Sequence, residues 1–257
     1  MDEFQKMIGK IRQRCPYNPK PEQESEYECR KCKDTGFIFK TDENGYEVAC
    51  RCECYEIRQS REMMRRSGIS GEFQKKTFDN FSTDCFSPSG NKQLINAKCK
   101  AIQYVEHFEV TEHDRYNSIM FTGQVGAGKT HLGTAICGAL MKKGVAVIYM
   151  AYRNAVTKIK QNIIDESVYN RELNQYTLAR VLYIDDLLKG RLTDADINIM
   201  YEIVNYRYMN NLPVIISTEK TPNELIEFDE AIGSRLLEMC RGNIIHLHGK
   251  ELNYRLN

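Results

Sequence analysis

The sequence predicts an α/β protein with a parallel five-stranded sheet, preceded by a small cysteine-containing domain. Three observations support this prediction. Short apolar segments alternate with amphipathic helical segments over residues 92–257. A glycine-rich G-x-x-x-x-G-K-T segment follows the first apolar segment, and closely spaced cysteines stand near the N-terminus. We therefore expect domains at 1–76 and 92–257, joined by a linker at 77–91.

The composition argues against a membrane protein and against a chain whose net charge would attract nucleic acid. Of the 257 residues, 42% are apolar and 28% are charged, and no apolar run approaches the length of a membrane span. The formal net charge is only +1, so any contact with nucleic acid must be local. The N-terminus has no apolar signal region. We expect a cytoplasmic protein with no membrane partner.

The glycine-rich segment has the pattern of a phosphate-binding P-loop. The expected nucleotide-binding residues are Gly123, Gln124, Val125, Gly126, Ala127, Gly128, Lys129, Thr130 and His131. Glycines let backbone N–H groups turn toward phosphate oxygens, and the following helix adds its positive N-terminal end. Lys129 can then reach the β- and γ-phosphates, while the Thr130 hydroxyl can bind Mg²⁺. The alternative is an ordinary glycine turn before a helix.

A second nucleotide-site motif follows an apolar run further along the chain. Val181–Ile184 leads directly into Asp185 and Asp186, which is the Walker B pattern. A strand here would bring Asp185 beside the P-loop to hold Mg²⁺, and Asp186 would orient the attacking water. The alternative is a polar turn after a strand, but a P-loop makes the Walker B interpretation the better one.

The remaining pattern predicts one sheet covered by helices on both faces. The expected strands are 118–121, 144–150, 181–184, 213–216 and 243–247. The expected helices are 92–108, 131–141, 152–165, 193–210, 222–227 and 230–240. Residues 166–176 are polar and unpatterned, so no helix is expected there. The nucleotide should lie at the carboxyl ends of the strands.

The cysteines near the N-terminus predict a structural zinc site. We favour four thiolate ligands and keep Cys50 as an alternative to either of the last two: Cys29, Cys32, Cys52 and Cys54. A turn signal at 42–45 predicts a hairpin between the two groups of cysteines, and helices are expected near Phe4–Ile11 and over 55–67. The alternatives are a redox pair or unrelated surface thiols.

Together these motifs resemble the AAA+ replicative helicase loaders of the DnaC/DnaI type over nearly the whole chain. The resemblance rests on Cys-x-x-Cys-x-Asp-Thr-Gly with its following Cys-x-Cys, Thr77–Phe81, Gly126–Leu132, Ile184–Leu187, Ile232–Arg235 and Asn253–Arg255. The related transposition ATPases of the IstB type share the ATPase part but usually lack the cysteine-containing front.

The resemblance implies an AAA+ ATPase that loads a hexameric replicative helicase onto single-stranded DNA, using ATP, Mg²⁺ and Zn²⁺. The 1–76 domain would bind the helicase. Hydrolysis would be slow and stimulated by DNA or by a partner, because Asp186 is shorter than the glutamate of many AAA+ enzymes. The alternative is an ATP-switched adaptor of a transposase, as in IstB-type proteins.

The resemblance also assigns roles to single residues. Lys129, Asp185 and Asp186 would be catalytic together with Arg235, which matches an arginine finger that acts on a neighbouring subunit of a homo-oligomer. Ser217 and Thr218 match the start of the sensor 1 segment. The possible DNA contacts lie on a segment that matches the extra helix of loaders, which is equally well read as a solvated crossover helix: Tyr152, Arg153, Lys158 and Lys160. Glu219 departs from the asparagine more usual in the sensor segment.

Overall fold

A computed structural model of the chain describes residues 27–43, 45–66, 71, 75–83 and 88–255. The chain forms two compact units, Met1–Cys52 and Glu53–Asn257. The helix expected near Phe4–Ile11 lies outside the described residues. Within the described part, no helix has both the length and the apolar character needed to cross a membrane.

The first unit contains an antiparallel hairpin of β1 (Phe37–Thr41) and β2 (Glu47–Arg51). Its turn begins at Asp42, whose backbone N–H donates to the Tyr46 carbonyl at 2.9 Å. The Asp42 carboxylate accepts the Tyr46 N–H at 2.8 Å, and Gly45 supplies a φ of 86°. The hairpin predicted between the two groups of cysteines is therefore present.

The second unit is built on a parallel sheet of five strands in the order β4-β5-β6-β3-β7. Their bounds are β3 Ile119–Gly123, β4 Val147–Ala151, β5 Val181–Leu187, β6 Val214–Thr218 and β7 Ile244–Leu247. The strands are apolar and mostly buried, as expected of a parallel sheet covered on both faces. The predicted sheet is confirmed.

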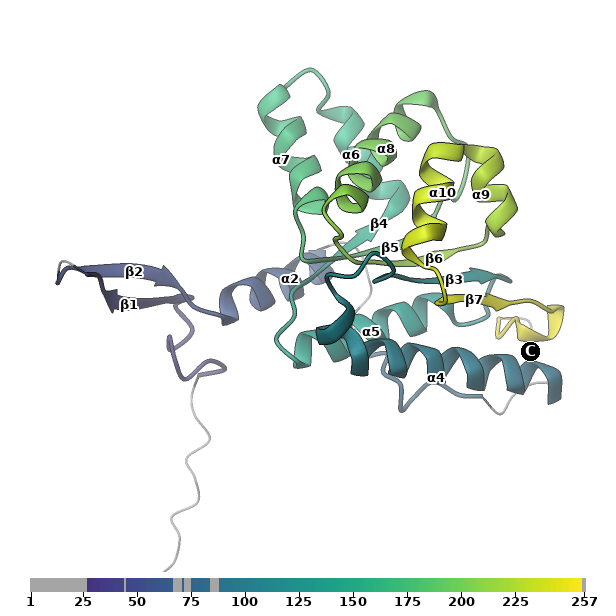
Figure 1. The fold of residues 1–257 in the computed structure, drawn as a ribbon, viewed down its shortest axis with the longest axis horizontal. Helices are drawn as coiled ribbons and strands as arrows, with labels where there is room; N and C mark the ends of the chain where they lie inside the picture. The colour runs from purple at the N-terminus through teal and green to yellow at the C-terminus, as the bar shows by residue number, and fades with distance from the viewer. Residues whose placement is uncertain (1–26, 44, 67–70, 72–74, 84–87, 256–257) are drawn as a thin grey trace, which may run out of the picture. The chain divides into compact units, whose positions relative to one another are not determined.

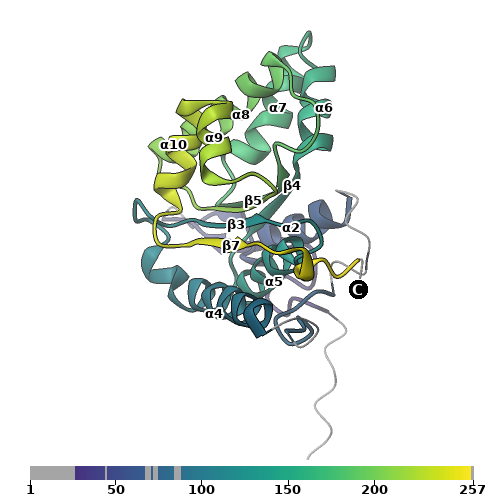
Figure 2. The ribbon, with the colours of Figure 1, turned by 90° about the vertical axis from the view of Figure 1, so that its right-hand side faces the viewer.

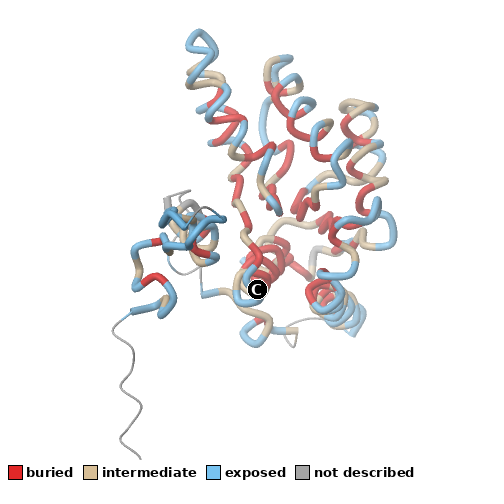
Figure 3. Tube along the Cα trace, turned by 60° about the vertical axis from the view of Figure 1, so that its left-hand side comes forward, coloured by how far each residue is buried: buried red, intermediate tan, exposed pale blue. Residues whose placement is uncertain are grey.

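Helices cover both faces of this sheet (Figures 1 and 2). One face carries α4 (Pro88–Thr111) and α5 (Lys129–Lys142), which pack through side chains such as Phe108 and Leu132. The other face carries α6 Tyr152–Gln161, α7 Glu166–Thr177, α8 Asp194–Met209, α9 Pro222–Phe228 and α10 Glu230–Met239. Buried positions recur along these helices between exposed ones (Figure 3). The unit also contains α2 (Cys54–Arg66) and a short 3₁₀ turn, Lys250–Leu252.

Two expectations about the helices are corrected. Residues 166–177 form α7, although no helix was expected there. Asp165 caps it by accepting the Val168 N–H at 3.1 Å, and Leu173 and Tyr176 are buried along one side. The other correction is the start of α4, which lies at Pro88 inside the expected linker because proline is well suited to a first helical turn.

Candidate nucleotide site and cysteine cluster

The P-loop connects the end of β3 to the start of α5, at the carboxyl edge of the sheet. Gly123, Gly126 and Gly128 have φ values of 118°, 75° and 83°, which side chains rarely tolerate. A Cβ added at Gly126 would lie 2.2 Å from Asn253 Oδ1, and one at Gly128 would lie 2.7 Å from the Phe81 ring. The glycines are therefore required by conformation and by close packing.

Lys129 is buried and lies over the loop that it follows. Its Nζ donates to the Gly123 carbonyl at 2.8 Å and to the Gln124 carbonyl at 2.7 Å. Burial lowers the pKa of Lys129, and the negative charges of Glu219 and Asp186 oppose that shift. The ammonium group is thus held against the backbone of the P-loop.

Asp185 lies beside the P-loop and accepts hydrogen bonds from hydroxyl groups. Thr130 Oγ1 donates to Asp185 Oδ1 at 2.9 Å, Tyr183 OH to the same oxygen at 2.8 Å, and Tyr149 OH to Oδ2 at 2.9 Å. Ser217 donates a further short hydrogen bond. Burial, followed by the charge of Asp185, raises the pKa of Tyr149 and Tyr183, which keeps both phenols protonated. Thr130 and Asp185 are hard oxygen donors of the kind that Mg²⁺ prefers.

Asp186 follows Asp185 at a β-bulge and has a different environment. The β5–β6 register shifts between Ile184 and Leu187, and Asp186 has a left-handed backbone with a φ of 56°. Its N–H donates to Ser217 Oγ at 3.0 Å. Its carboxylate accepts a hydrogen bond from Lys189 Nζ at 2.8 Å. The bulge therefore directs the two consecutive acids to different partners.

Lys189 and Glu219 lie beside Asp186 in the lining of the nucleotide pocket. Lys189 Nζ also lies 3.1 Å from Glu219 Oε1, and both residues line the nucleotide pocket. The carboxylates of Asp186 and Glu219 raise the pKa of Lys189. Sequence reasoning assigned Lys189 no role, although a lysine three residues after a Walker B acid is visible in the sequence.

The pocket has a volume of about 390 Å³ and is bounded by two further segments of the second unit. His131 Nε2 lies 2.9 Å from the Thr77 carbonyl and 3.0 Å from Asn80 Oδ1, so that nitrogen carries the proton. The Phe81 ring meets the His131 ring edge-on at 5.1 Å. Burial lowers the pKa of His131. The expected linker thus forms one wall of the pocket.

The C-terminal segment forms another wall. Tyr254 N–H donates to the Gly126 carbonyl at 3.2 Å, and Tyr254 OH donates to the Ser82 carbonyl at 2.5 Å. Arg255 also lines the pocket. The sequence showed Asn253–Arg255 as a motif without giving it a place in the site, so Phe81, Tyr254 and Arg255 were missed.

The expected sensor residues end β6, beside the acids. Ser217 binds Asp185 and the backbone of Asp186, as described above. Thr218 Oγ1 donates to the Leu187 carbonyl at 2.9 Å and therefore holds the strand bulge. Their sensor role remains a prediction.

Arg235 lies on α10 and does not line the nucleotide pocket of its own chain. Its Nη1 donates to the Ala231 carbonyl at 2.7 Å, and its guanidinium lies 5.5 Å from the centroids of both Tyr201 and Tyr208. Its Nε is buried and has no hydrogen-bond partner. This position is compatible with a finger that acts on another subunit, and that role remains a prediction.

The residues expected to contact DNA are on or near α6 but do not form one exposed row. Tyr152 is only 2% exposed, so its ring is not available to stack on a base in this structure. Lys158 pairs with Glu172 at 2.8 Å and Lys160 pairs with Asp196 at 2.6 Å. Arg153 is exposed.

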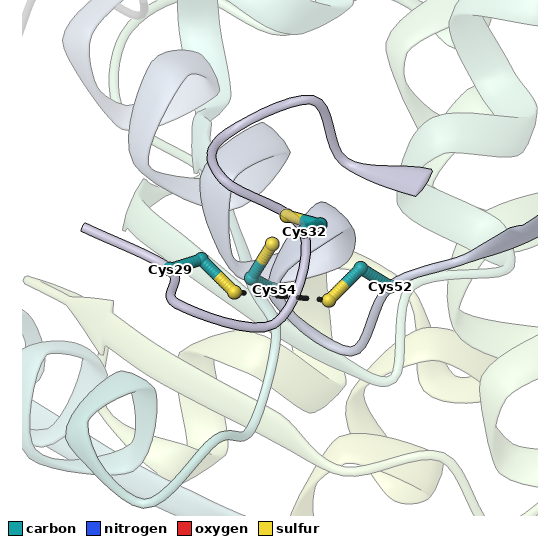
Figure 4. Close-up of side chains that lie close together, drawn as sticks. All are labelled: Cys29, Cys32, Cys52 and Cys54. Carbon is teal, nitrogen blue, oxygen red and sulfur yellow. Dashed lines mark hydrogen bonds between the residues drawn. The ribbon is translucent and has the colours of Figure 1, made fainter. Parts of the chain in front are cut away.

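The cysteine cluster is formed by Cys29, Cys32, Cys52 and Cys54, with Sγ atoms that all lie within 4.8 Å of one another (Figure 4). Tetrahedral zinc with Zn–S bonds of about 2.3 Å places sulfur atoms about 3.8 Å apart. The Sγ atoms of Cys29 and Cys52 are 3.8 Å apart. The donor set and spacing fit Zn²⁺. Cys50, the alternative ligand, pairs across the hairpin with Ile38 and is not part of the cluster.

The first two cysteines are held by a tight backbone knuckle. Lys33, Asp34 and Gly36 have φ values of 46°, 67° and 79°. Asp34 Oδ1 accepts the Cys29 N–H at 2.8 Å, and Gly36 N–H donates to Cys32 Sγ at 3.3 Å. Such N–H donation favours a thiolate. The knuckle is thus shaped for metal ligation.

Comparison with known proteins agrees with this geometry. The family described as IstB-like ATP binding protein matches residues 54–247. The phage-like element PBSX protein XkdC of Bacillus subtilis (strain 168) is 36% identical over 241 residues, 90% of this chain and 87% of that protein. The replicative helicase loader DnaC of Escherichia coli (strain K12) is 27% identical over 177 residues, 68% and 67% of the two chains. A crystal structure of the DnaC helicase loader has a TM-score of 0.56 at 21% identity, covering 70% of this chain and 100% of that one. The fold is therefore that of AAA+ ATPases.

Proposed function

Because the chain belongs to the IstB-like ATP-binding protein family, whose members are ATPases, we propose that it loads a replicative DNA helicase onto single-stranded DNA. The observation that carries this proposal is a P-loop in contact with the Walker B acid Asp185, in the same chain as a four-cysteine cluster and its hairpin. The similarity to the helicase loader DnaC supports the same conclusion. An ATPase without a partner would not need the additional unit.

The nucleotide chemistry follows from four residues. Lys129 binds the β- and γ-phosphates, and Thr130 and Asp185 hold Mg²⁺, which neutralises phosphate charge when bound. Asp186 is the residue placed to orient water and to take its proton, because its carboxylate faces the pocket instead of the hydroxyl cluster around Asp185. Arg235 acts on the phosphates bound by a neighbouring subunit, so the full site requires an oligomer.

The first unit offers an apolar surface for the helicase. Phe37, Phe39, Tyr46 and Val48 on the hairpin are 45%, 71%, 70% and 45% exposed. Exposed apolar side chains that gather on one small element mark protein–protein contact sites. Zinc in the cysteine cluster stabilises this unit, since a hairpin alone is marginally stable.

The proposal is tested with a pull-down of the full chain against the replicative helicase of the organism that encodes it, with and without ATP. We expect the helicase to be retained, and Phe39→Ser to reduce retention about tenfold while ATP binding stays intact. Val110→Ser is a matched control, because Val110 is 82% exposed on α4 and belongs to the second unit, not to the hairpin. If the helicase is not retained by the parent chain, the loader function is wrong.

A second function is favoured by one specific observation. The matching family is of the IstB type, and its match covers the ATPase unit but begins at residue 54, at the end of the cysteine cluster. An adaptor that recruits a transposase would use the same ATP site. Retention of a transposase, but not of the helicase, in the same pull-down would support the adaptor.

A further inference from the structure

The carboxylates of Asp186 and Glu219 both line the nucleotide pocket. Negative charges at this place oppose the binding of a polyphosphate, because like charges at close range repel one another. The proposed hydrolysis uses Asp185 and Asp186 as its two acids, and nothing in it requires Glu219. The pocket therefore carries one more negative charge than the reaction needs, and a cation has to compensate it.

Lys189 is placed to compensate both carboxylates. Its Nζ donates to Asp186 Oδ2 at 2.8 Å and lies 3.1 Å from Glu219 Oε1. The hydrogen bonds to Asp186 and Glu219 raise the pKa of Lys189, so its ammonium group stays charged at neutral pH. The Lys189 side chain is nevertheless 46% exposed and lines the pocket, so a bound nucleotide can reach it.

The ammonium group of Lys189 has capacity for a further acceptor. A lysine ammonium carries three N–H donors, and among the described residues only Asp186 and Glu219 accept from this one. A phosphate oxygen is a well-suited third acceptor, because a hydrogen bond between two charged groups is stronger than one between neutral groups. Lys189 can thus bind a phosphate without leaving either carboxylate.

The backbone around Lys189 holds the side chain at the pocket. Asp186 and Leu188 have φ values of 56° and 59° without being glycines, a conformation that costs free energy and is often found at functional sites. Leu188 is only 2% exposed and packs in the core. The Lys189 N–H donates to the Asp186 carbonyl at 3.1 Å and closes the turn. The turn is therefore fixed at both ends of the residue that reaches the pocket.

The contact with Asp186 indicates which phosphate Lys189 would meet. Lys129 binds the β- and γ-phosphates in the proposed site, and Asp186 has to reach the water that attacks the γ-phosphorus. A cation bonded to Asp186 therefore lies next to the γ-phosphate. Besides burial, the charge of Lys189 contributes to the lowered pKa of Lys129, so the two ammonium groups are close enough to act on one ligand.

We propose that Lys189 binds the γ-phosphate of ATP and is the residue by which the site distinguishes ATP from ADP, with Glu219 as the counter-ion that holds its ammonium group in place. The inference rests on the proposed ATPase function and names a specificity-determining residue of that site. Because Asp186 and Glu219 fix the ammonium group before the nucleotide binds, little side-chain freedom is lost on binding. ADP ends at the β-phosphate and cannot make this contact.

The central test is Lys189→Met in the full chain, with the dissociation constants of ADP and of the non-hydrolysable ATP analogue AMPPCP measured by competition with a fluorescent ATP analogue. The affinity for AMPPCP should fall about tenfold, the lower end of the range for a charge-assisted hydrogen bond, since Lys189 is partly exposed. The affinity for ADP should fall less than about twofold. Lys189→Arg should keep most of the preference for AMPPCP, because it keeps the charge and the donors.

Lys220→Met is the matched control for this test. Lys220 pairs with Glu224 at 3.7 Å and does not line the pocket, so both affinities should equal those of the parent. Equal losses of AMPPCP and ADP affinity in Lys189→Met, or no loss of either, overturn the proposal.

A second variant separates a direct contact from simple neutralisation of charge. In Lys189→Met combined with Glu219→Gln, one positive and one negative charge are removed together, so the net charge beside Asp186 is the same as in the parent. The affinity for AMPPCP should then recover only in part and stay about threefold below the parent, because the donor to the γ-phosphate is still missing. Recovery to the parent's affinity would show that Lys189 only neutralises its neighbours and would overturn the contact.

These outcomes are separable from failure of the proposed function. A parent chain that binds neither ADP nor AMPPCP refutes the nucleotide site itself, and a parent chain that retains no helicase in the pull-down refutes the loader alone. A parent chain that binds both nucleotides, with Lys189→Met retaining the full preference for AMPPCP, refutes only the role of Lys189.

Discussion

The cysteine cluster and the nucleotide site are both built on tight loops, but they are assembled in different ways. The cluster takes all four ligands from residues 29–54, and its knuckle is stabilised by its own backbone. The nucleotide site combines residues 76–82, 123–131, 186–189 and the segment around Tyr254. We therefore expect the first site to depend on a bound metal, whereas the second depends on the folded sheet and on segments far apart in the sequence.

The largest effect is expected from Cys32→Ser, which tests whether the cluster depends on metal. Loss of one of four thiolates should release zinc and unfold the first unit, because structural zinc supplies about 10 kcal/mol or more to such small units. ATP hydrolysis should persist, since the nucleotide pocket has no cysteine in its lining. Metal analysis and limited proteolysis check this.

Cys50→Ser is the matched control, because Cys50 is outside the cluster. It should retain one zinc per chain. Zinc that survives Cys32→Ser but is lost in Cys50→Ser would contradict the ligand set.

Lys129→Ala should have the next largest effect and acts only on the nucleotide site. It removes the charge that binds the β- and γ-phosphates, so ATP affinity should fall about a hundredfold or more. Titration with a fluorescent ATP analogue measures this, and zinc content should not change. Unaltered ATP affinity would refute the P-loop assignment.

Tyr254→Phe tests whether the nucleotide site needs the C-terminal segment. The variant loses the hydrogen bond to the Ser82 carbonyl, which is worth about 1 kcal/mol. ATP affinity should weaken about fivefold. The matched control is Tyr206→Phe, because Tyr206 is 39% exposed on α8 and does not line the pocket. An equal ATP affinity in Tyr254→Phe and the parent would show that this hydrogen bond of the C-terminal segment does not contribute to nucleotide binding.

The smallest effect is a pH dependence at His131. Burial lowers its pKa below the usual value of about 6.5. As pH falls below about 6.5, the unfolded chain binds a proton that the folded chain resists, so stability is full above that pH and is lost below it. Thermal unfolding from pH 7.5 to 5.5 should show this loss, reduced in His131→Gln. An identical pH profile for His131→Gln and the parent would exclude the histidine as its source.

The sequence predicted those parts of the molecule in which neighbouring residues act together. The glycines of the P-loop, the acids after Val181–Ile184 and the cysteine pairs are each local patterns, and the structure brings each group to the position expected of it. The parallel sheet followed from alternating apolar runs.

The parts that were missed depend on tertiary packing. The helix α7 is mostly polar, and only Leu173 and Tyr176 of its apolar residues are buried, so its helical pattern is weak in the sequence. The contact between Lys189 and Asp186 depends on a β-bulge and on residues with left-handed backbone conformations, which no local sequence motif predicts. The burial of Tyr152 likewise follows from packing among α6, α7 and α8, not from its own position in the sequence.

The contact between Tyr254 and the P-loop has a consequence for truncated forms of the chain. A stop codon at position 253 would leave the ATPase sheet intact but would remove the residues that close the pocket over Gly126 and Ser82. Such a late truncation should resemble a nucleotide-binding mutant instead of a mild trimming of the end.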